Sequence, residues 1–133
     1  MKFVNGNDKD KLDDLDLIKQ CLLKVDLSDV RGALGIAREI RGLGTAGASG
    51  LLSLMYSETF ATVDQFVVKA LRGVRGLPEA DVLDEMNERD LSIEDGVLLI
   101  NVIQRKTTEN NHIFDSVEWT PRKIDKILWT FGR

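Results

Sequence analysis

The chain has 133 residues, 43% of them hydrophobic and 30% charged, which is enough apolar content for one core and too little chain for two. The formal net charge of −4 argues against a broadly electropositive surface, and the single cysteine, Cys21, excludes an internal disulfide. The longest apolar run, at 97–100, is too short to span a membrane. These features predict a single domain over residues 1–133 of a cytoplasmic protein with no membrane association.

Apolar residues at helical spacing predict an all-α fold, a compact bundle of about six or seven helices without a strand. The first helix is expected at residues 8–24, where Ile18 and Leu22 belong to the apolar stripe. Five aspartates near its beginning are interpreted as charges favoured at a helix N-terminus, because the glycine of a calcium loop is missing. Cys21 is interpreted as a small buried hydrophobic residue.

The next two predicted helices flank a glycine turn. The earlier one begins after Ser28 or Asp29, either of which can cap it, and runs to about Ile40. The later one covers residues 46–56. Ala48 keeps this helix narrow at the point where it must cross its neighbour.

Four further segments have helical periodicity and recognisable ends. Ser92 begins a Ser-x-x-Asp sequence, which is similar to a capping box. Thr120 and Pro121 mark the beginning of the last helix, whose apolar face is predicted to include Ile127 and Phe131. His112 is interpreted as a surface loop residue without metal-binding neighbours. The four predicted segments are 63–74, 78–86, 92–109 and 120–132.

The most distinctive stretch is the turn Gly42-Leu43-Gly44 between two apolar helices, followed 20 residues later by Asp64 at the beginning of another helix. Both glycines are expected to adopt backbone angles that other residues avoid and to allow close approach of another backbone. Over about residues 27–75 this arrangement resembles the hairpin-and-aspartate module of the helix-hairpin-helix DNA glycosylase superfamily, to which endonuclease III belongs.

The resemblance implies weak, sequence-nonspecific binding of duplex DNA through backbone amides of the hairpin, aided by nearby cations. It implies that Asp64 is the catalytic carboxylate. Ala46 stands where bifunctional members have their lysine nucleophile, so an active protein would resemble the monofunctional members. No cysteine follows Cys21, so no iron–sulfur cluster, other metal or cofactor is predicted. The residues predicted to bind DNA are Gly42, Leu43, Gly44, Thr45, Lys69 and Arg72.

Two alternatives stay open at this stage. Asp64 also fits a purely structural role, because a carboxylate at a helix N-terminus accepts hydrogen bonds from free amides. The hairpin itself could simply pack helices in a non-catalytic interaction domain that forms a homodimer. Only 26 residues precede the matched region, too few for the helical half that completes the base pocket in that superfamily. DNA binding is therefore the favoured prediction, and catalysis by Asp64 is not favoured.

Overall fold

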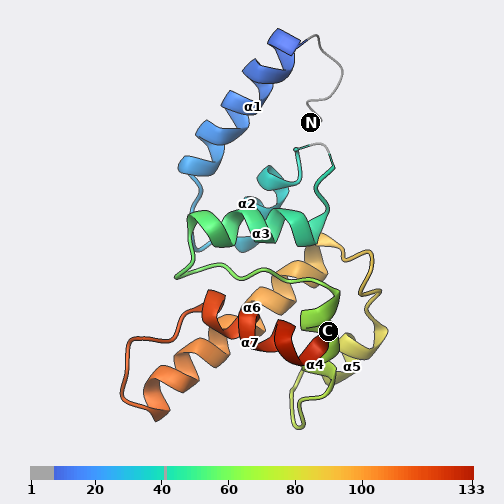
Figure 1. Cartoon of the computed structure of the whole chain (residues 1–133), viewed down its shortest axis with the longest axis vertical. Helices are drawn as coiled ribbons and strands as arrows, with labels where there is room; N and C mark the ends of the chain where they lie inside the picture. The colour runs from blue at the N-terminus through green and yellow to red at the C-terminus, as the bar shows by residue number, and fades with distance from the viewer. Residues whose placement is uncertain (1–7, 41) are drawn as a thin grey trace.

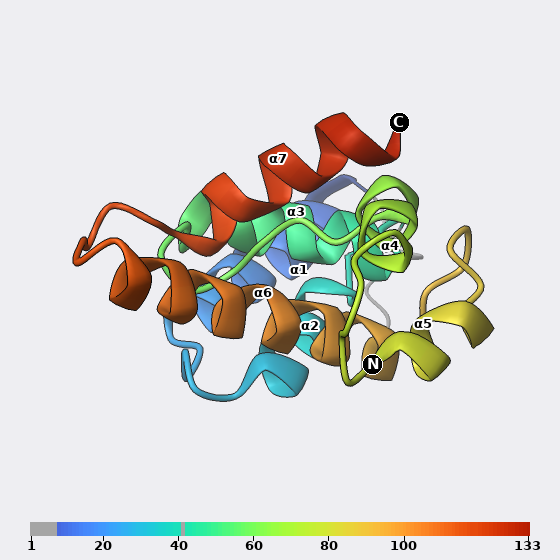
Figure 2. The same cartoon turned by 90° about the horizontal axis from the view of Figure 1, so that it is seen from below.

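The computed structural model describes residues 8–40 and 42–133, and within them it contains seven helices and no strand, which confirms the all-α prediction. None of the described helices is long and apolar enough to cross a membrane. Figures 1 and 2 show the arrangement. The helices are α1 (Asp8–Leu23), α2 (Val30–Ala37), α3 (Thr45–Met55), α4 (Gln65–Arg72), α5 (Ala80–Glu85), α6 (Ile93–Ile113) and α7 (Pro121–Gly132).

The long helix α6 forms the base on which α2, α3 and α7 pack, as the two perpendicular views show. Its apolar side carries Leu99, Ile100 and Ile103, all fully buried. Phe60, from the chain between α3 and α4, fills the same core. Burial of these large side chains is the main favourable contribution to folding.

Helix α1 leans away from this body and contacts it through α2 (Figure 1). Ile18 and Leu22 are buried there, and the Tyr56 hydroxyl donates a 2.7 Å hydrogen bond to the Leu22 carbonyl. Cys21 is exposed, so the prediction that it is buried is wrong. Both α2 and the C-cap residue of α3 therefore contact the end of α1.

Capping residues near the helix beginnings agree with the sequence. Asp29 accepts from the Gly32 amide, and Thr120 accepts from the Lys123 amide. Ser92 and Asp95 form a complete capping box at α6. Each of these contacts joins residues three apart, so sequence proximity alone brings the partners together.

Two predicted helix ends are wrong. Helix α2 stops at Ala37 rather than Ile40, because tighter three-residue turns replace the helical hydrogen bonds there. Helix α6 continues to Ile113, which places His112 in its last turn instead of in a loop. Beyond the predicted end at residue 109, the Asn111 side chain donates to the Trp119 carbonyl and accepts from the Trp119 amide, both at 3.0 Å.

The predicted apolar face of α7 is also wrong in part. Ile127 and Phe131 are 43% and 79% exposed, whereas Ile124 and Asp125 are buried. The face that α7 presents inward is set by its packing along α4, and α4 and α7 are in close contact. Trp129 is 39% exposed and packs against the ring of Phe66 in α4.

The close approach of α6 to α3 generates a test with paired glycine variants. A Cβ on Gly96 would lie 2.5 Å from the Thr45 methyl group, whereas one on Gly35 in α2 would meet nothing within 4 Å. We expect Gly96→Ala to lower the free energy of unfolding by about 1–2 kcal/mol through overpacking. Gly35→Ala should raise it by about 0.5–1 kcal/mol. Urea unfolding followed by circular dichroism measures both, and equal stabilisation would contradict the close packing at Gly96.

Candidate nucleic-acid interface

The turn between α2 and α3 places its two glycines differently. Gly42 has φ of +89°, a conformation that residues with a Cβ rarely adopt. Gly44 has φ of −85° and is the N-cap residue of α3, in an extended conformation open to any residue. The expectation that both glycines need special backbone angles is therefore correct for Gly42 and wrong for Gly44. Both are exposed, and an added Cβ at either would meet nothing within 4 Å.

The beginning of α3 has unpaired amides. Gly44 has no side chain to cap the helix, and the first bond back to the turn runs from the Ala48 amide to the Gly44 carbonyl at 2.9 Å. Within the described parts of the chain, the amides of Thr45, Ala46 and Gly47 donate no hydrogen bond. Unpaired amides and the helix dipole together favour an anion at such a terminus.

The predicted hairpin residues differ in what they can offer a ligand. Leu43 folds back over α3, where its Cδ2 lies 2.8 Å from the position of a Cβ on Gly47. Thr45 is 1% exposed and packs against Gly96, and its Oγ1 has no hydrogen-bond partner among the residues that the structure describes. Thr45 therefore offers a ligand almost no accessible surface, from its side chain or from its backbone.

A group of polar side chains, which we call the polar seam, ties the extended segment 59–64 to its neighbours. The segment runs back along α3 toward the hairpin, between α3 and α7 (Figures 1 and 2). The Val63 amide donates to Ser49 Oγ at 2.9 Å. Thr62 Oγ1 lies 2.9 Å from Ser53 Oγ. The Thr62 amide donates to Asp125 Oδ2 at 2.7 Å. The members of the polar seam are Ser49, Ser53, Thr62, Arg122 and Asp125.

Asp125 is the charged centre of the polar seam, with 3% of its surface exposed. Arg122 lies beside it, and its NH1 nitrogen donates to Asp125 Oδ1 at 3.0 Å and to Thr62 Oγ1 at 2.9 Å. Burial raises the pKa of the Asp125 carboxyl above its ordinary value, although the Thr62 amide and the Arg122 charge act in the opposite direction.

Asp64 follows the polar seam directly and caps α4. Its Oδ1 accepts hydrogen bonds from the Phe66 and Val67 amides, both at 3.0 Å. The structural role predicted for this carboxylate is thereby confirmed. Its other oxygen accepts no hydrogen bond from the residues that the structure describes, so the side chain retains capacity for a ligand. The catalytic role stays a prediction.

A surface depression of about 390 Å³ lies beside Asp64, between α4 and α7. Its walls combine the two carboxylates with two cations, Arg122 and Lys126, and with the ring of Trp129. The charges balance, so the depression is polar rather than strongly basic. Its lining residues are Thr62, Asp64, Val67, Arg122, Asp125, Lys126, Trp129 and Thr130.

Aromatic rings and cations alternate next to this depression. Phe66 and Trp129 meet edge to face, with ring centroids 5.9 Å apart. Lys69 Nζ lies 5.7 Å from the Phe66 centroid, and the Arg133 guanidinium lies 4.7 Å from the Trp129 centroid. Lys69 is exposed, so its ammonium is accessible to a ligand.

Arg72 has a different environment from the one predicted. Its guanidinium donates to the carbonyls of Leu83 and Met86 at 2.9 and 2.7 Å, and to the Glu88 carboxylate at 3.3 Å. It thus connects the end of α4 to α5 and the loop that follows. With three partners inside the protein, Arg72 is bound to the scaffold, and Lys69 is the more available cation of the two.

Sequence reasoning missed Asp125 entirely. One signal could have found it: Asp125 lies beside Ile124 and between Pro121 and Leu128 on the inward stripe of an amphipathic helix, where a charged residue needs a partner. Its partner, the Thr62 amide, is 63 residues away in sequence and could not be identified in advance. No group of three or more metal-binding side chains occurs in the described ranges.

Comparisons of this chain with protein-family models, with curated proteins and with solved structures find no match.

The raised pKa of Asp125 predicts a pH dependence of stability. A carboxyl that is easier to protonate in the folded state contributes stability below its unfolded pKa of about 3.9, and that contribution is lost as the pH rises through the folded pKa. We therefore expect the stability of the parent protein relative to Asp125→Asn to decrease with rising pH over this window. Urea unfolding from pH 3 to 7 measures the difference, with the exposed Asp84→Asn as control; the opposite slope would contradict the assignment.

Proposed function

We propose that this protein binds the sugar-phosphate backbone of duplex DNA through the Gly42–Gly44 turn and the first amides of α3. The observation that carries the proposal is the uncapped beginning of α3, where exposed Gly44 is followed by half-buried Ala46 and Gly47, whose amides have no partner among the described residues. A Cβ on Gly44 would meet nothing within 4 Å. Phosphate oxygens are the acceptors that such a terminus favours. Contacts of this kind carry no sequence information, so the binding is expected to be nonspecific.

The placement of Asp64 supports the same proposal. The Val63 amide binds Ser49, one turn into α3, so the polar seam returns Asp64 to the hairpin end of that helix. Lys126 and Lys69 are exposed near this carboxylate and its aromatic neighbours, and they can contact flanking phosphates. Local cations thus offset the overall charge of −4 where DNA would lie.

Chemistry on the bound DNA is a further part of the proposal. Asp64 is the residue that would act, by stabilising positive charge on a deoxyribose ring or by orienting water. Ala46, in the first turn of α3, offers no amine. A covalent imine with the sugar is therefore excluded at this position, and any base excision would depend on water.

A homodimeric interaction domain is the second candidate. Ile127 and Phe131 are one helical turn apart on the outer side of α7, and both are exposed. An apolar pair of this kind is a common feature of protein interfaces. Sedimentation velocity separates the candidates: a stable dimer without affinity for DNA supports this second one.

We expect Gly44→Val to lower DNA affinity at least tenfold while the protein remains folded. Its backbone angles suit valine, and the added side chain would project into open space beside the free amides, where it would exclude a phosphate. Fluorescence anisotropy with a labelled duplex at low salt measures the effect. Gly35→Val is the matched control, because it adds the same side chain in open space outside the turn.

Salt dependence checks the mode of binding in the same assay. Release of counterions from one to three phosphates gives a slope of about −1 to −3 when the logarithm of affinity is plotted against that of salt concentration. Unchanged affinity of Gly44→Val, or binding insensitive to salt, would assign the hairpin to helix packing alone.

The variant Asp64→Asn distinguishes the helix-capping role of Asp64 from its proposed catalytic role. Asparagine caps helices about as well as aspartate, so stability should change by less than about 0.5 kcal/mol and DNA affinity should stay equal or rise. Any base excision should disappear, and borohydride should trap no protein–DNA adduct in parent or variant. Incubation with duplexes containing damaged or mismatched bases measures both. Retained excision in Asp64→Asn would move the catalytic role to another residue, and a trapped adduct would reveal a lysine nucleophile.

A further inference from the structure

A second hollow, distinct from the proposed DNA-binding surface, lies between α4, α6 and α7. It has a volume of about 560 Å³, within the range of small-molecule sites. On α7 it is lined by Ile124 and Leu128, whereas Asp125 and Trp129 line the depression beside Asp64. Consecutive residues are about 100° apart around a helix, so these two pairs lie on adjacent sides of α7. The two sites share no lining residue.

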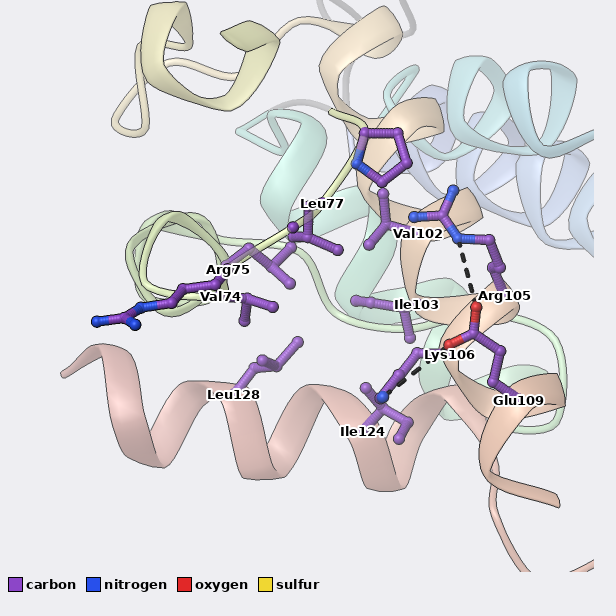
Figure 3. Close-up of a pocket in the computed structure, with 13 residues that line it drawn as sticks. Val74, Arg75, Leu77, Val102, Ile103, Arg105, Lys106, Glu109, Ile124 and Leu128 are labelled. Carbon is purple, nitrogen blue, oxygen red and sulfur yellow. Dashed lines mark ion pairs between the residues drawn. The ribbon is translucent and has the colours of Figure 1, made fainter. Parts of the chain in front are cut away.

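Most of the residues that line this cavity are apolar, and 4 of the 13 are charged. In Figure 3 the side chains of Val74, Leu77, Ile103, Ile124 and Leu128 converge on one space from three directions. Val74 is 43% exposed at the edge, so the space opens to solvent. An aliphatic chain would bury apolar surface here without displacing any core residue.

One cation reaches this apolar space. Figure 3 shows the Lys106 side chain lying over Ile124 with its ammonium at the cavity, whereas Arg75 points away. The nearest acid is Glu109, 4.0 Å from Lys106 Nζ, and both side chains are about half exposed. Within the residues described, Lys106 makes no hydrogen bond, so its donors are available. A solvated ion pair at this distance contributes little stability and is easily replaced.

Arg105 reinforces the positive edge of the cavity. It pairs mainly with Glu79, which lies outside the cavity, and reaches Glu109 only at 4.0 Å. Among the described residues that line the cavity, Glu109 is therefore the one carboxylate, next to both Arg105 and Lys106. A carboxylate from a ligand could take its place beside Lys106 and form shorter, charge-assisted hydrogen bonds.

We infer that this cavity binds a small amphipathic carboxylate, an unbranched aliphatic acid whose chain lies against Val74, Leu77 and Leu128 and whose carboxylate contacts Lys106 Nζ. The apolar walls account for the chain, and the available ammonium at their edge accounts for the acid group. The inference is independent of DNA binding.

Titration of the 133-residue chain with sodium octanoate, followed through its methyl resonances, tests the inference. Octanoate should shift the methyl signals of Ile103, Ile124 and Leu128, and 1-octanol should bind at least tenfold more weakly because it lacks the charge. Val74→Trp should abolish both effects, since the ring would fill the mouth at an exposed position that the core does not need.

The variant Lys106→Gln tests the contribution of the Lys106 charge to ligand binding. It should weaken octanoate binding at least tenfold and leave 1-octanol binding unchanged, whereas Lys123→Gln, an exposed lysine of α7 outside the cavity, should change neither. Equal affinity for octanoate and 1-octanol, full octanoate binding by Lys106→Gln, signals shifted elsewhere, or no binding at all would each overturn the inference.

Discussion

The hydrogen bond from the Thr62 amide to the buried Asp125 carboxylate fixes how the two halves of the chain meet. Segment 59–64 has no strand partner, so its backbone polar groups need side chains to replace water. Ser49 and Asp125 accept from its amides, and Gln104 donates to the Thr59 carbonyl at 2.8 Å. Three helices therefore hold one extended segment, and removing any of these side chains would leave a backbone group unpaired.

That arrangement determines where Asp64 lies and therefore where α4 begins. Because the extended segment runs antiparallel to α3, the cap of α4 returns to the hairpin end of α3. Helix α7 then packs along α4 so closely that a Cβ on Gly132 would lie 1.7 Å from the Phe66 carbonyl oxygen. The same helix lies between the depression beside Asp64 and the aliphatic cavity, and adjacent sides of it line the two.

The hairpin illustrates how one residue type can serve different purposes within a short stretch. Gly42 is required by its positive φ, whereas Gly44 leaves the helix end unobstructed and uncapped. Gly96 allows α6 to contact Thr45 directly beneath that end. Substitutions at Gly42 and Gly96 are thus expected to change the stability of the protein. A substitution at Gly44 is expected to change the accessibility of the beginning of α3 instead.

The sequence by itself determined the all-α class and the caps at Asp64, Ser92 and Thr120, since each cap joins residues two or three apart. It left Ser28 and Asp29 as alternatives for the cap of α2, which the structure assigns to Asp29. It also located the hairpin turn. Only the tertiary structure decided that α6 continues past Asn111, that Arg72 binds the scaffold, that Phe131 is exposed and that Asp125 is buried. Those outcomes depend on partners 8 to 63 residues away or on which face a neighbouring helix covers. Local periodicity shows that a helix has an apolar side, but only packing determines which residues become its inner surface.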